Sequence, residues 1–282
     1  MRATFWLLEA PDSLSQQSRR EPDGTGLGSF APSGRPVVAK QPLAAYEDQA
    51  FARAAREVSS RTFVAHIRYA STGGLRAENT HPFEQEGRLF AHNGVIGDLP
   101  ALEGELGTAR SLVHGHTDSE RFFALITREI ERDGDGDVDV GAAITRAAHW
   151  ISQRLPVYAL NLVLTTAREL WALRYPDTHE LFVLERAAGG PAGNRHLEQA
   201  SAPGTIRVRS GDLAGTRAVI VASERMDEDP GWRALEPGQL LHVGEELSVS
   251  CETVLDEPPA HLLSLTDLDP RAAASQAGAA GK

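Results

Sequence analysis

Apolar and polar residues alternate over many short stretches of this chain, a period of two that is typical of half-buried β-strands. The clearest case is residues 62–70, TFVAHIRYA, in which every second side chain from Phe63 onward would face one side. Residues 88–96, RLFAHNGVI, predict two short strands joined at Asn93-Gly94, because Asn-Gly between apolar residues is typical of a hairpin turn. From residue 157 onward, several further strand-like segments follow one another, separated by turn residues.

Three segments have the period of an amphipathic helix instead. They are residues 47–60, 117–133 and 140–155. In the second of them, either Thr117 or Asp118 is placed to cap the helix, and Glu120 is placed to complete a capping box with Thr117. Because the strands mostly follow one another and do not alternate with helices, antiparallel sheets are favoured over a parallel α/β fold. The pattern therefore predicts an α+β protein.

Segments rich in glycine, aspartate or small residues separate these elements. Residues 133–139, DGDGDVD, resemble a calcium-binding loop, but the glycine and the final glutamate that such a loop needs are both missing, so we expect a solvated linker. Residues 186–196 are expected to form an exposed loop. The end of the chain, residues 266–282, is expected to be disordered. The remainder, residues 1–265, is expected to be a single domain.

Composition and charge limit the classes of protein to which the chain can belong. The 282 residues are 41% hydrophobic and 24% charged, which is ordinary for a globular protein. The net charge is −11, and no cluster of Lys or Arg is present, so we expect no nucleic-acid partner. No stretch is long and apolar enough for a membrane span or a signal peptide, and the single cysteine, Cys251, permits no internal disulfide. We therefore expect no membrane association and a cytoplasmic location.

Half of the ten histidines lie between residues 66 and 118, together with several asparagine, arginine and aspartate residues. One explanation is a metal site, because His114, His116 and Asp118 occupy alternate positions that a strand would direct to one side. Gly115 would interrupt such a strand, and the histidines would then be loop residues. We expect no metal, but a metal-dependent His/Asp hydrolase stays open as an alternative.

A second explanation is the hydrolysis of an amide without a metal or another cofactor. A tetrahedral oxyanion needs fixed hydrogen-bond donors, which the side-chain amide of Asn93 and the backbone N–H of Gly94 would supply. An amino-acid substrate also carries a carboxylate, which suits the guanidinium of Arg68, and an ammonium, which suits the carboxylate of Asp118. Taken singly, Arg68 is equally well explained as a surface residue and Asp118 as a helix cap. Taken together, these residues predict a binding site for a small amino-acid substrate.

Several motifs resemble the glutaminase domain of class II glutamine amidotransferases, which are N-terminal-nucleophile hydrolases. The resemblance is strongest from Phe5 to Arg128, and it points to the free-standing type of this domain. The motifs are HIRYAST (66–72), NTHPF (79–83), LFAHNGVIGD (89–98), HTDSERFF (116–123), PDGTGLG (22–28), LLEAPDSL (7–14) and VASERMDEDPGW (221–232).

The resemblance implies both a fold and a set of roles. The fold would be a four-layer αββα sandwich with two stacked antiparallel sheets. The matching residues would have the roles that their chemistry suggests: the arginine for the substrate carboxylate, the aspartate for its ammonium, and the Asn-Gly pair for the oxyanion hole. The family pattern also places Ser71 and Thr72, in the loop after the arginine, along the same pocket.

The nucleophile of that family, an N-terminal cysteine, has no counterpart in this sequence. Arg2 stands at the corresponding position, and Cys251 lies in a late alternating strand, where a buried or half-buried structural thiol is expected. Either an upstream segment with the nucleophile strand is missing from the sequence, or the protein is an inactive relative that binds glutamine. We expect the first, because the residues for the substrate are all present.

The resemblance thus predicts a class II glutamine amidotransferase-like amidohydrolase. Such an enzyme releases ammonia from the side-chain amide of glutamine, or hydrolyses a γ-glutamyl compound, through a cysteine thioester. Its partners would be the small-molecule substrate and, if ammonia is transferred, a separate ammonia-accepting synthase. The sequence does not choose between these substrates. The metal-dependent hydrolase and the glutamine-binding relative are the alternatives.

Overall fold

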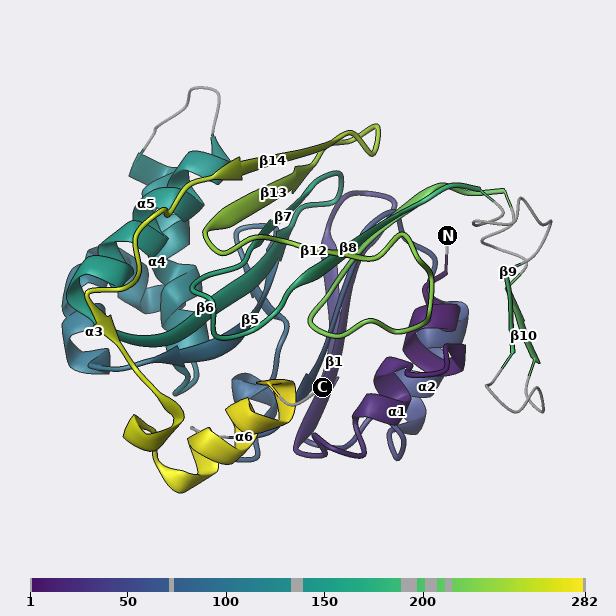
Figure 1. Ribbon diagram of the computed structural model, residues 1–282, viewed down its shortest axis with the longest axis horizontal. Coiled ribbons are helices and arrows are strands. Elements are labelled where there is room, and N and C mark those ends of the chain that lie inside the picture. The colour runs from purple at the N-terminus through teal and green to yellow at the C-terminus, as the bar shows by residue number, and fades with distance from the viewer. Residues whose placement is uncertain are drawn as a thin grey trace.

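Two layers of β-sheet lie face to face, and helices cover the outer face of each layer (Figure 1). This arrangement confirms the predicted four-layer α+β architecture. The computed structural model describes residues 2–70, 74–132, 139–188, 197–200, 207–210 and 215–280.

The larger sheet has seven strands, in the order β14-β13-β7-β6-β5-β4, with β15 paired to β6. Its central strands β5 and β6 are antiparallel and mostly buried, because helices cover one face of the sheet and the second sheet layer covers the other. The bounds are β4 (Phe83–Gln85), β5 (Arg88–Ile96), β6 (Pro156–Thr165), β7 (Leu170–Leu173), β13 (Gln239–Val243), β14 (Val249–Thr253) and β15 (His261–Leu262).

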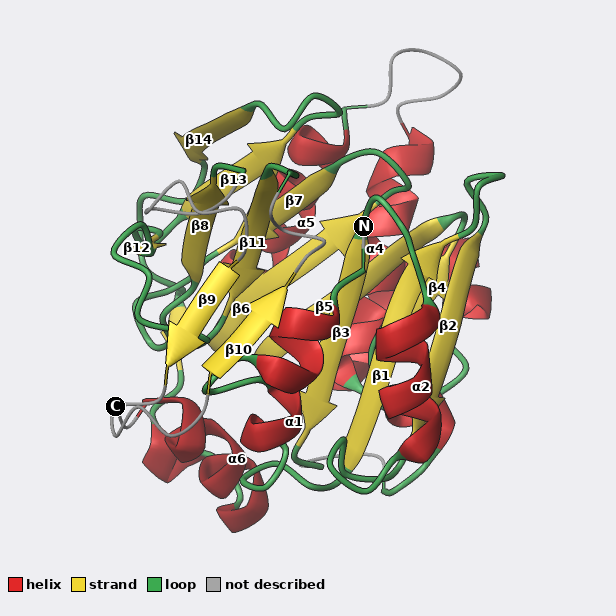
Figure 2. Ribbon diagram, turned by 90° about the vertical axis from the view of Figure 1, so that its right-hand side faces the viewer, coloured by secondary structure: helices red, strands yellow, loops and turns green. Residues whose placement is uncertain are grey.

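The second layer consists of two separate three-stranded sheets, β2-β1-β3 and β11-β8-β12. Among the described strands, β3 pairs only with β1 and β11 only with β8, apart from a single bridge between Pro22 and Arg68. The larger sheet is visible between them in Figure 2. The bounds are β1 (Gly24–Phe30), β2 (Pro36–Gln41), β3 (Phe63–Arg68), β8 (Phe182–Arg186), β11 (Ala218–Ala222) and β12 (Arg233–Ala234), and a further ladder joins β9 (Leu197–Ala200) to β10 (Arg207–Ser210).

The helices hold each sheet layer from outside. The largest apolar cluster lies where α4 and α5 pack on β5 and β6, and it contains the fully buried side chains of Phe90, Phe122 and Leu160. Burying each such side chain contributes about 1.5–3 kcal/mol. The outer helices on this side are α3 (Leu99–Leu106), α4 (Asp118–Arg132) and α5 (Val140–Arg154), and those on the other side are η1 (Phe5–Glu9), α1 (Leu14–Gln17) and α2 (Gln49–Glu57).

The three predicted helices are confirmed as α2, α4 and α5. Asp48 caps the N-terminus of α2, since its side chain accepts hydrogen bonds from the backbone N–H groups of Ala50 and Phe51. Two short 3₁₀ turns, η2 (Ala77–Asn79) and η3 (Gly107–Leu112), lie in the loops. Residues 133–138 of the segment that resembles a calcium loop, and residues 189–196 of the predicted exposed loop, lie outside the described residues.

The prediction of a hairpin turn at Asn93-Gly94 is wrong. β5 continues through both residues, and Asn93 lies opposite Asn161 and Gly94 opposite Leu160 on β6. The glycine is needed for another reason, because a Cβ atom on Gly94 would lie 1.9 Å from the carbonyl oxygen of Ala159. Close approach of the two strand backbones, and not a turn, explains the glycine.

The residues from 266 onward differ from the disordered tail that we expected. They complete the turn η4 (Leu265–Asp267) and form helix α6 (Pro270–Ala280). Oε1 of Gln276 on α6 lies 2.7 Å from Nε2 of His179, which ties the helix to the rest of the protein. The segment lacks strong apolar periodicity, but its many alanines have high helix propensity. Within the described chain, no helix is long and apolar enough to cross a bilayer.

Candidate active site

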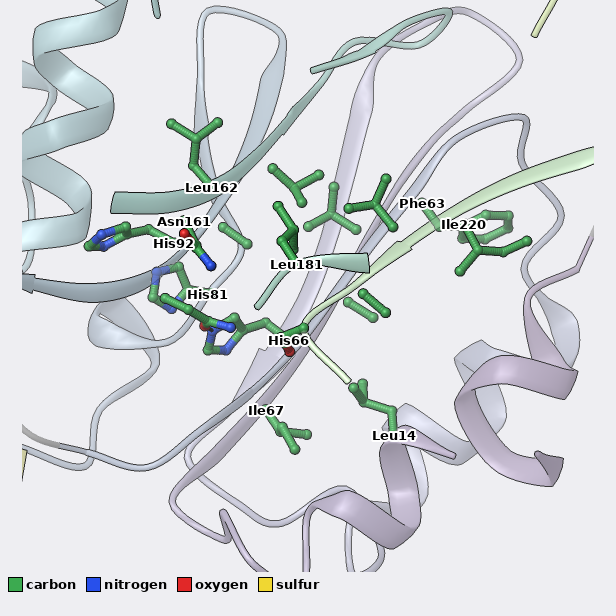
Figure 3. Close-up of a pocket in the computed structure, with 18 of the residues that line it drawn as sticks. Leu14, Phe63, His66, Ile67, His81, His92, Asn161, Leu162, Leu181 and Ile220 are labelled. Carbon is green, nitrogen blue, oxygen red and sulfur yellow. Dashed lines mark hydrogen bonds between the residues drawn. The ribbon is translucent and has the colours of Figure 1, made fainter. Parts of the chain in front are cut away.

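A cavity of about 310 Å³ lies between the sheet layers, and both β3 and β11 line it. Residues of η1, α1, β5, β6, β7, β13, the beginning of α4 and part of α6 also line it. Figure 3 shows the imidazoles of His66, His81 and His92 gathered at one end, while apolar side chains such as Phe63 and Ile220 lie toward the other. The cavity therefore has a polar end and an apolar end.

Four residues singled out in the sequence line this one cavity: Arg68, Asn93, Gly94 and Asp118. They come from three elements, since β3 ends at Arg68, β5 contains the Asn-Gly pair, and α4 begins at Asp118. A cation, an anion and an amide are thus brought together from segments that are distant in the sequence.

Asn93 and Gly94 reach the cavity from the middle of β5. Oδ1 of Asn93 lies 2.8 Å from Nε2 of His66 on β3, so this contact crosses from one sheet layer to the other. Gly94 carries no side chain, which leaves its backbone as the cavity wall at that point. A side-chain amide and an adjacent backbone N–H are the kind of donors that stabilise an oxyanion.

Arg68 is the last residue of β3 and is only 5% exposed. Its Nη1 donates a hydrogen bond of 2.8 Å to the backbone carbonyl of Gly74. Burial lowers the pKa of Arg68, and the carboxylate of Asp23 opposes this shift; an arginine nevertheless stays charged at neutral pH. Ser71 and Thr72, in the loop that follows, lie outside the described residues, so their place at the pocket stays a prediction.

Asp118 begins α4, and its carboxylate is held by backbone N–H groups from two elements. The N–H of Ile96 donates to Oδ2 and the N–H of Ser119 donates to Oδ1, each at 2.9 Å. The negative charge is also favourable at the N-terminus of a helix. These bonds fix the carboxylate between β5 and α4, and each oxygen has a further lone pair that can accept a hydrogen bond from a bound ammonium.

The first turn of α4 holds the loop that precedes it. The carboxylate of Glu120 accepts hydrogen bonds from the backbone N–H groups of His114 and Gly115, at 3.1 and 2.6 Å. Oγ1 of Thr117 accepts from the N–H of Glu120 at 3.2 Å, which confirms Thr117 as the cap, although Glu120 bonds to the loop and not back to Thr117. Nowhere among the described residues are three His, Cys, Asp or Glu side chains grouped so that they could hold a metal ion. The side chains of His114, His116 and Asp118 are therefore not grouped as the ligands of a metal ion.

Four imidazoles that had no role in the sequence-based prediction line the cavity: those of His66, His81, His92 and His179. Burial is the main cause that lowers the pKa of each, and the pKa of His66 falls to about 4. They are therefore neutral at pH 7 and act as hydrogen-bonding groups. The concentration of histidines in the sequence indicated a functional site, but it does not show which histidines come into contact between the two sheet layers.

Cys251 lies on β14 and is exposed, so the expectation of a buried or half-buried thiol is wrong. Its Sγ is 3.9 Å from Nη2 of Arg233, and it is not among the residues that line the cavity. The thiol of Cys251 is therefore not placed to attack a substrate held there.

Two stacked antiparallel sheet layers between helical layers define the class of fold. A solved structure titled glutamine phosphoribosylpyrophosphate (PRPP) amidotransferase from B. subtilis, complexed with ADP and GMP, superposes with a TM-score of 0.57. The alignment covers 87% of this chain and 46% of that chain at 19% identity, so it establishes a likeness of fold.

Within this class, the chain belongs to the class-II glutamine amidotransferases, whose family pattern matches residues 12–261. An uncharacterized protein of Methanocaldococcus jannaschii is 29% identical over 245 residues, which are 82% of this chain and 63% of that protein. The gamma-glutamyl-hercynylcysteine sulfoxide hydrolase of Mycolicibacterium smegmatis is 29% identical over 251 residues, 84% of this chain and 88% of that protein. The chain thus spans less than two thirds of the archaeal relative but most of the hydrolase.

Proposed function

We propose that the cavity binds a γ-glutamyl group, and that the protein is an amidohydrolase that cleaves the γ-amide bond. The observation that carries this proposal is the shared cavity, where a guanidinium, a carboxylate and an amide from β3, α4 and β5 come together. Membership of the family and the similarity to a γ-glutamyl hydrolase support the general kind of reaction.

In this proposal, the α-amino-acid end and the γ-carbonyl end of the substrate bind to different residues. The guanidinium of Arg68 pairs with the α-carboxylate, and the carboxylate of Asp118 accepts hydrogen bonds from the α-ammonium. The γ-carbonyl oxygen lies between Nδ2 of Asn93 and the backbone N–H of Gly94. Both donors interact more strongly as that oxygen becomes negative, and one such donor contributes about 3–4 kcal/mol to transition-state stabilisation.

The proposed reaction has two steps. A thiolate attacks the carbonyl carbon of the γ-amide, the C–N bond breaks, and ammonia or an amine leaves with the proton that came from the thiol, so that a thioester remains. Water then attacks the thioester, which releases glutamate and returns a proton to the sulfur. Neither step needs a metal or a cofactor.

The thiol for this reaction must come from a residue other than Cys251, and we propose that it is carried by a further strand between β3 and β11. Two observations support such a strand. The facing edges of β3 and β11 are not paired to each other, and both strands line the cavity. In addition, Val219, Ile220 and Val221 of β11 are apolar but only half-buried. A strand in this place would bond to both edges and join the two small sheets into one.

Binding is tested on the chain as it stands, by titration calorimetry with L-glutamine and L-glutamate. Both are expected to bind, and Arg68→Gln is expected to weaken binding at least tenfold, because hydrogen bonds to a charged group contribute about 1.5–3 kcal/mol. Arg56→Gln, at an exposed position on α2, is the matched control and should leave the affinity unchanged. Absence of binding, or the same affinity in both variants, contradicts the proposed site.

Turnover distinguishes the amidohydrolase from a glutamine-binding relative. A chain that carries a cysteine-led apolar strand ahead of Arg2 is expected to release glutamate, and Asn93→Ala in that chain should lower kcat about 100-fold or more. A comparison of glutamine with γ-glutamylcysteine then shows whether the product is ammonia, which a separate synthase would accept, or an amine. Binding without turnover in the extended chain favours the binding protein.

A further inference from the structure

His66 of β3 reaches Asn93 of β5, so that one side-chain contact joins the two sheet layers at the polar end of the cavity. Nε2 of His66 lies 2.8 Å from Oδ1 of Asn93. The ring centroids of His66 and His81 are 4.2 Å apart with a tilt of 32°, and His81 packs in turn against Phe83 at 4.7 Å. Figure 3 shows His66 and His81 side by side. The imidazole of His66 is therefore held in position by packing as well as by its hydrogen bond.

The position of the proton on His66 decides which end of the Asn93 amide faces the cavity. Burial lowers the pKa of His66 to about 4, so the ring carries one proton at pH 7. Nδ1 of this ring is buried and has no hydrogen-bond partner among the described residues. A proton on Nδ1 would leave a buried N–H without an acceptor, which is rarer in proteins than an unused acceptor. The buried Nδ1 without a partner therefore favours a proton on Nε2, which faces Oδ1 of Asn93.

With its proton on Nε2, His66 donates to Oδ1 of Asn93 and so fixes the orientation of the amide. Nδ2 then points away from His66, and it forms no hydrogen bond with any other described residue. We infer that His66 is a positioning residue, which holds the amide of Asn93 with its donor end available to the cavity. The inference rests on the proposed function only in that the oxygen received there is the γ-carbonyl oxygen of the substrate.

The tautomer is tested by NMR on the chain without ligand. In protein labelled with ¹⁵N-histidine, two-bond ¹H–¹⁵N correlations at pH 7 are expected to place the proton of His66 on Nε2. His66→Gln identifies the signals that belong to this ring. A proton on Nδ1 overturns the inference, because Nε2 would then be unable to donate to Asn93.

Two substitutions test the effect on the amide itself. His66→Leu removes the donor, whereas His66→Gln keeps an N–H of similar reach. The side-chain NH₂ signals of Asn93 are expected to shift or broaden in H66L and to stay close to their original positions in H66Q. His242→Leu, a half-buried histidine of β13 outside the cavity, is the matched control. Unchanged Asn93 signals in H66L overturn the inference, and if H66L does not fold, the tautomer still decides.

Kinetics in the form that carries the nucleophile strand distinguish positioning from a structural role. H66L is expected to lower kcat tenfold or more with little change in KM, because the lost orientation matters most when the oxyanion forms, and H66Q is expected to recover most of the rate. The NMR experiments need no turnover. An Nε2 proton in a protein that hydrolyses nothing would reject the proposed reaction alone, and an Nδ1 proton in an active protein would reject this inference alone.

Discussion

At the scale of single residues, the candidate site depends on how closely two backbones approach each other at Gly94. Any side chain there would meet the carbonyl group of Ala159 on the neighbouring strand. The absence of a side chain at Gly94 thus keeps β5 and β6 paired through the middle of the site, and the pairing holds the adjacent Asn93 in place.

Gly94→Ala is expected to destabilise the protein by about 1–3 kcal/mol, because its Cβ can be accommodated only if β5 and β6 separate. Gly104→Ala is the matched control: Gly104 lies in α3 with no atom within 4 Å of an added Cβ, so alanine should stabilise the helix by up to about 1 kcal/mol. Urea unfolding of both variants measures the difference. Equal stability of the two variants would show that the close approach at Gly94 is not a constraint.

At this scale, the sequence was sufficient to select candidate site residues, but not to predict which side chains they contact. Arg68, Asn93 and Asp118 were singled out because their chemistry suits a zwitterion, and they do line one cavity. The contact of His66 with Asn93 could not be derived, because it joins two sheets and leaves no periodic trace along the chain. The turn expected at Gly94 was wrong because pairing with a distant strand overrode the local preference of Asn-Gly.

At the scale of elements, the start of α4 connects helix, loop and site. Glu120 is buried in the first turn of α4 and accepts two hydrogen bonds from the loop before it, while Asp118 bonds to β5. Because these carboxylates are neighbours on one helical turn, the geometry of the loop and the position of the Asp118 carboxylate are set together.

Glu120→Ala is expected to cost about 2–4 kcal/mol of stability, because the backbone N–H groups of His114 and Gly115 both lose their acceptor. Glu131→Ala, at an exposed position of the same helix, should change stability by less than about 0.5 kcal/mol. Thermal or urea unfolding measures both variants. If E120A unfolds like E131A, the loop does not depend on this carboxylate.

The helices α2, α4 and α5 could be predicted because each has a strong period and a clear start. The division of the second layer into two sheets could not, since pairing between strands that are far apart in sequence is not encoded by alternation alone. Helix α6 was missed for a different reason: small residues give little amphipathic signal, so its alanine-rich sequence resembles that of a disordered tail.

At the scale of the whole molecule, the cavity is lined by buried histidines whose protonation at acidic pH lowers the stability of the folded protein. Burial lowers the pKa of His66, His81, His92 and His179 in the folded protein, whereas each is near 6.5 in an unfolded chain. Below about pH 6.5, the unfolded chain therefore binds protons that the folded protein does not. Glu21 acts in the opposite sense, because burial raises its pKa to about 7.

Stability is therefore expected to be greatest above about pH 6.5 and to fall as the pH decreases toward 4, since four groups outweigh one. Between pH 7 and pH 5 the loss should be roughly 2 kcal/mol or more, given about 1.4 kcal/mol for each unit of pKa difference. Urea unfolding at pH 7, 6 and 5 and constant ionic strength measures it. A free energy of unfolding that stays constant or rises toward pH 5 would contradict this account.

The interruption of the second layer also bears on how the protein behaves at high concentration. Unpaired strand edges are templates for aggregation when they lie on the outside of a protein. Here the open edges of β3 and β11 lie along the wall of a cavity, and β6 also lines it. A strand from another molecule could not pair with an exposed outer edge. It would have to enter the cavity lengthwise, between β3 and β11. The same recess that leaves backbone groups unpaired thus shelters them from intermolecular association.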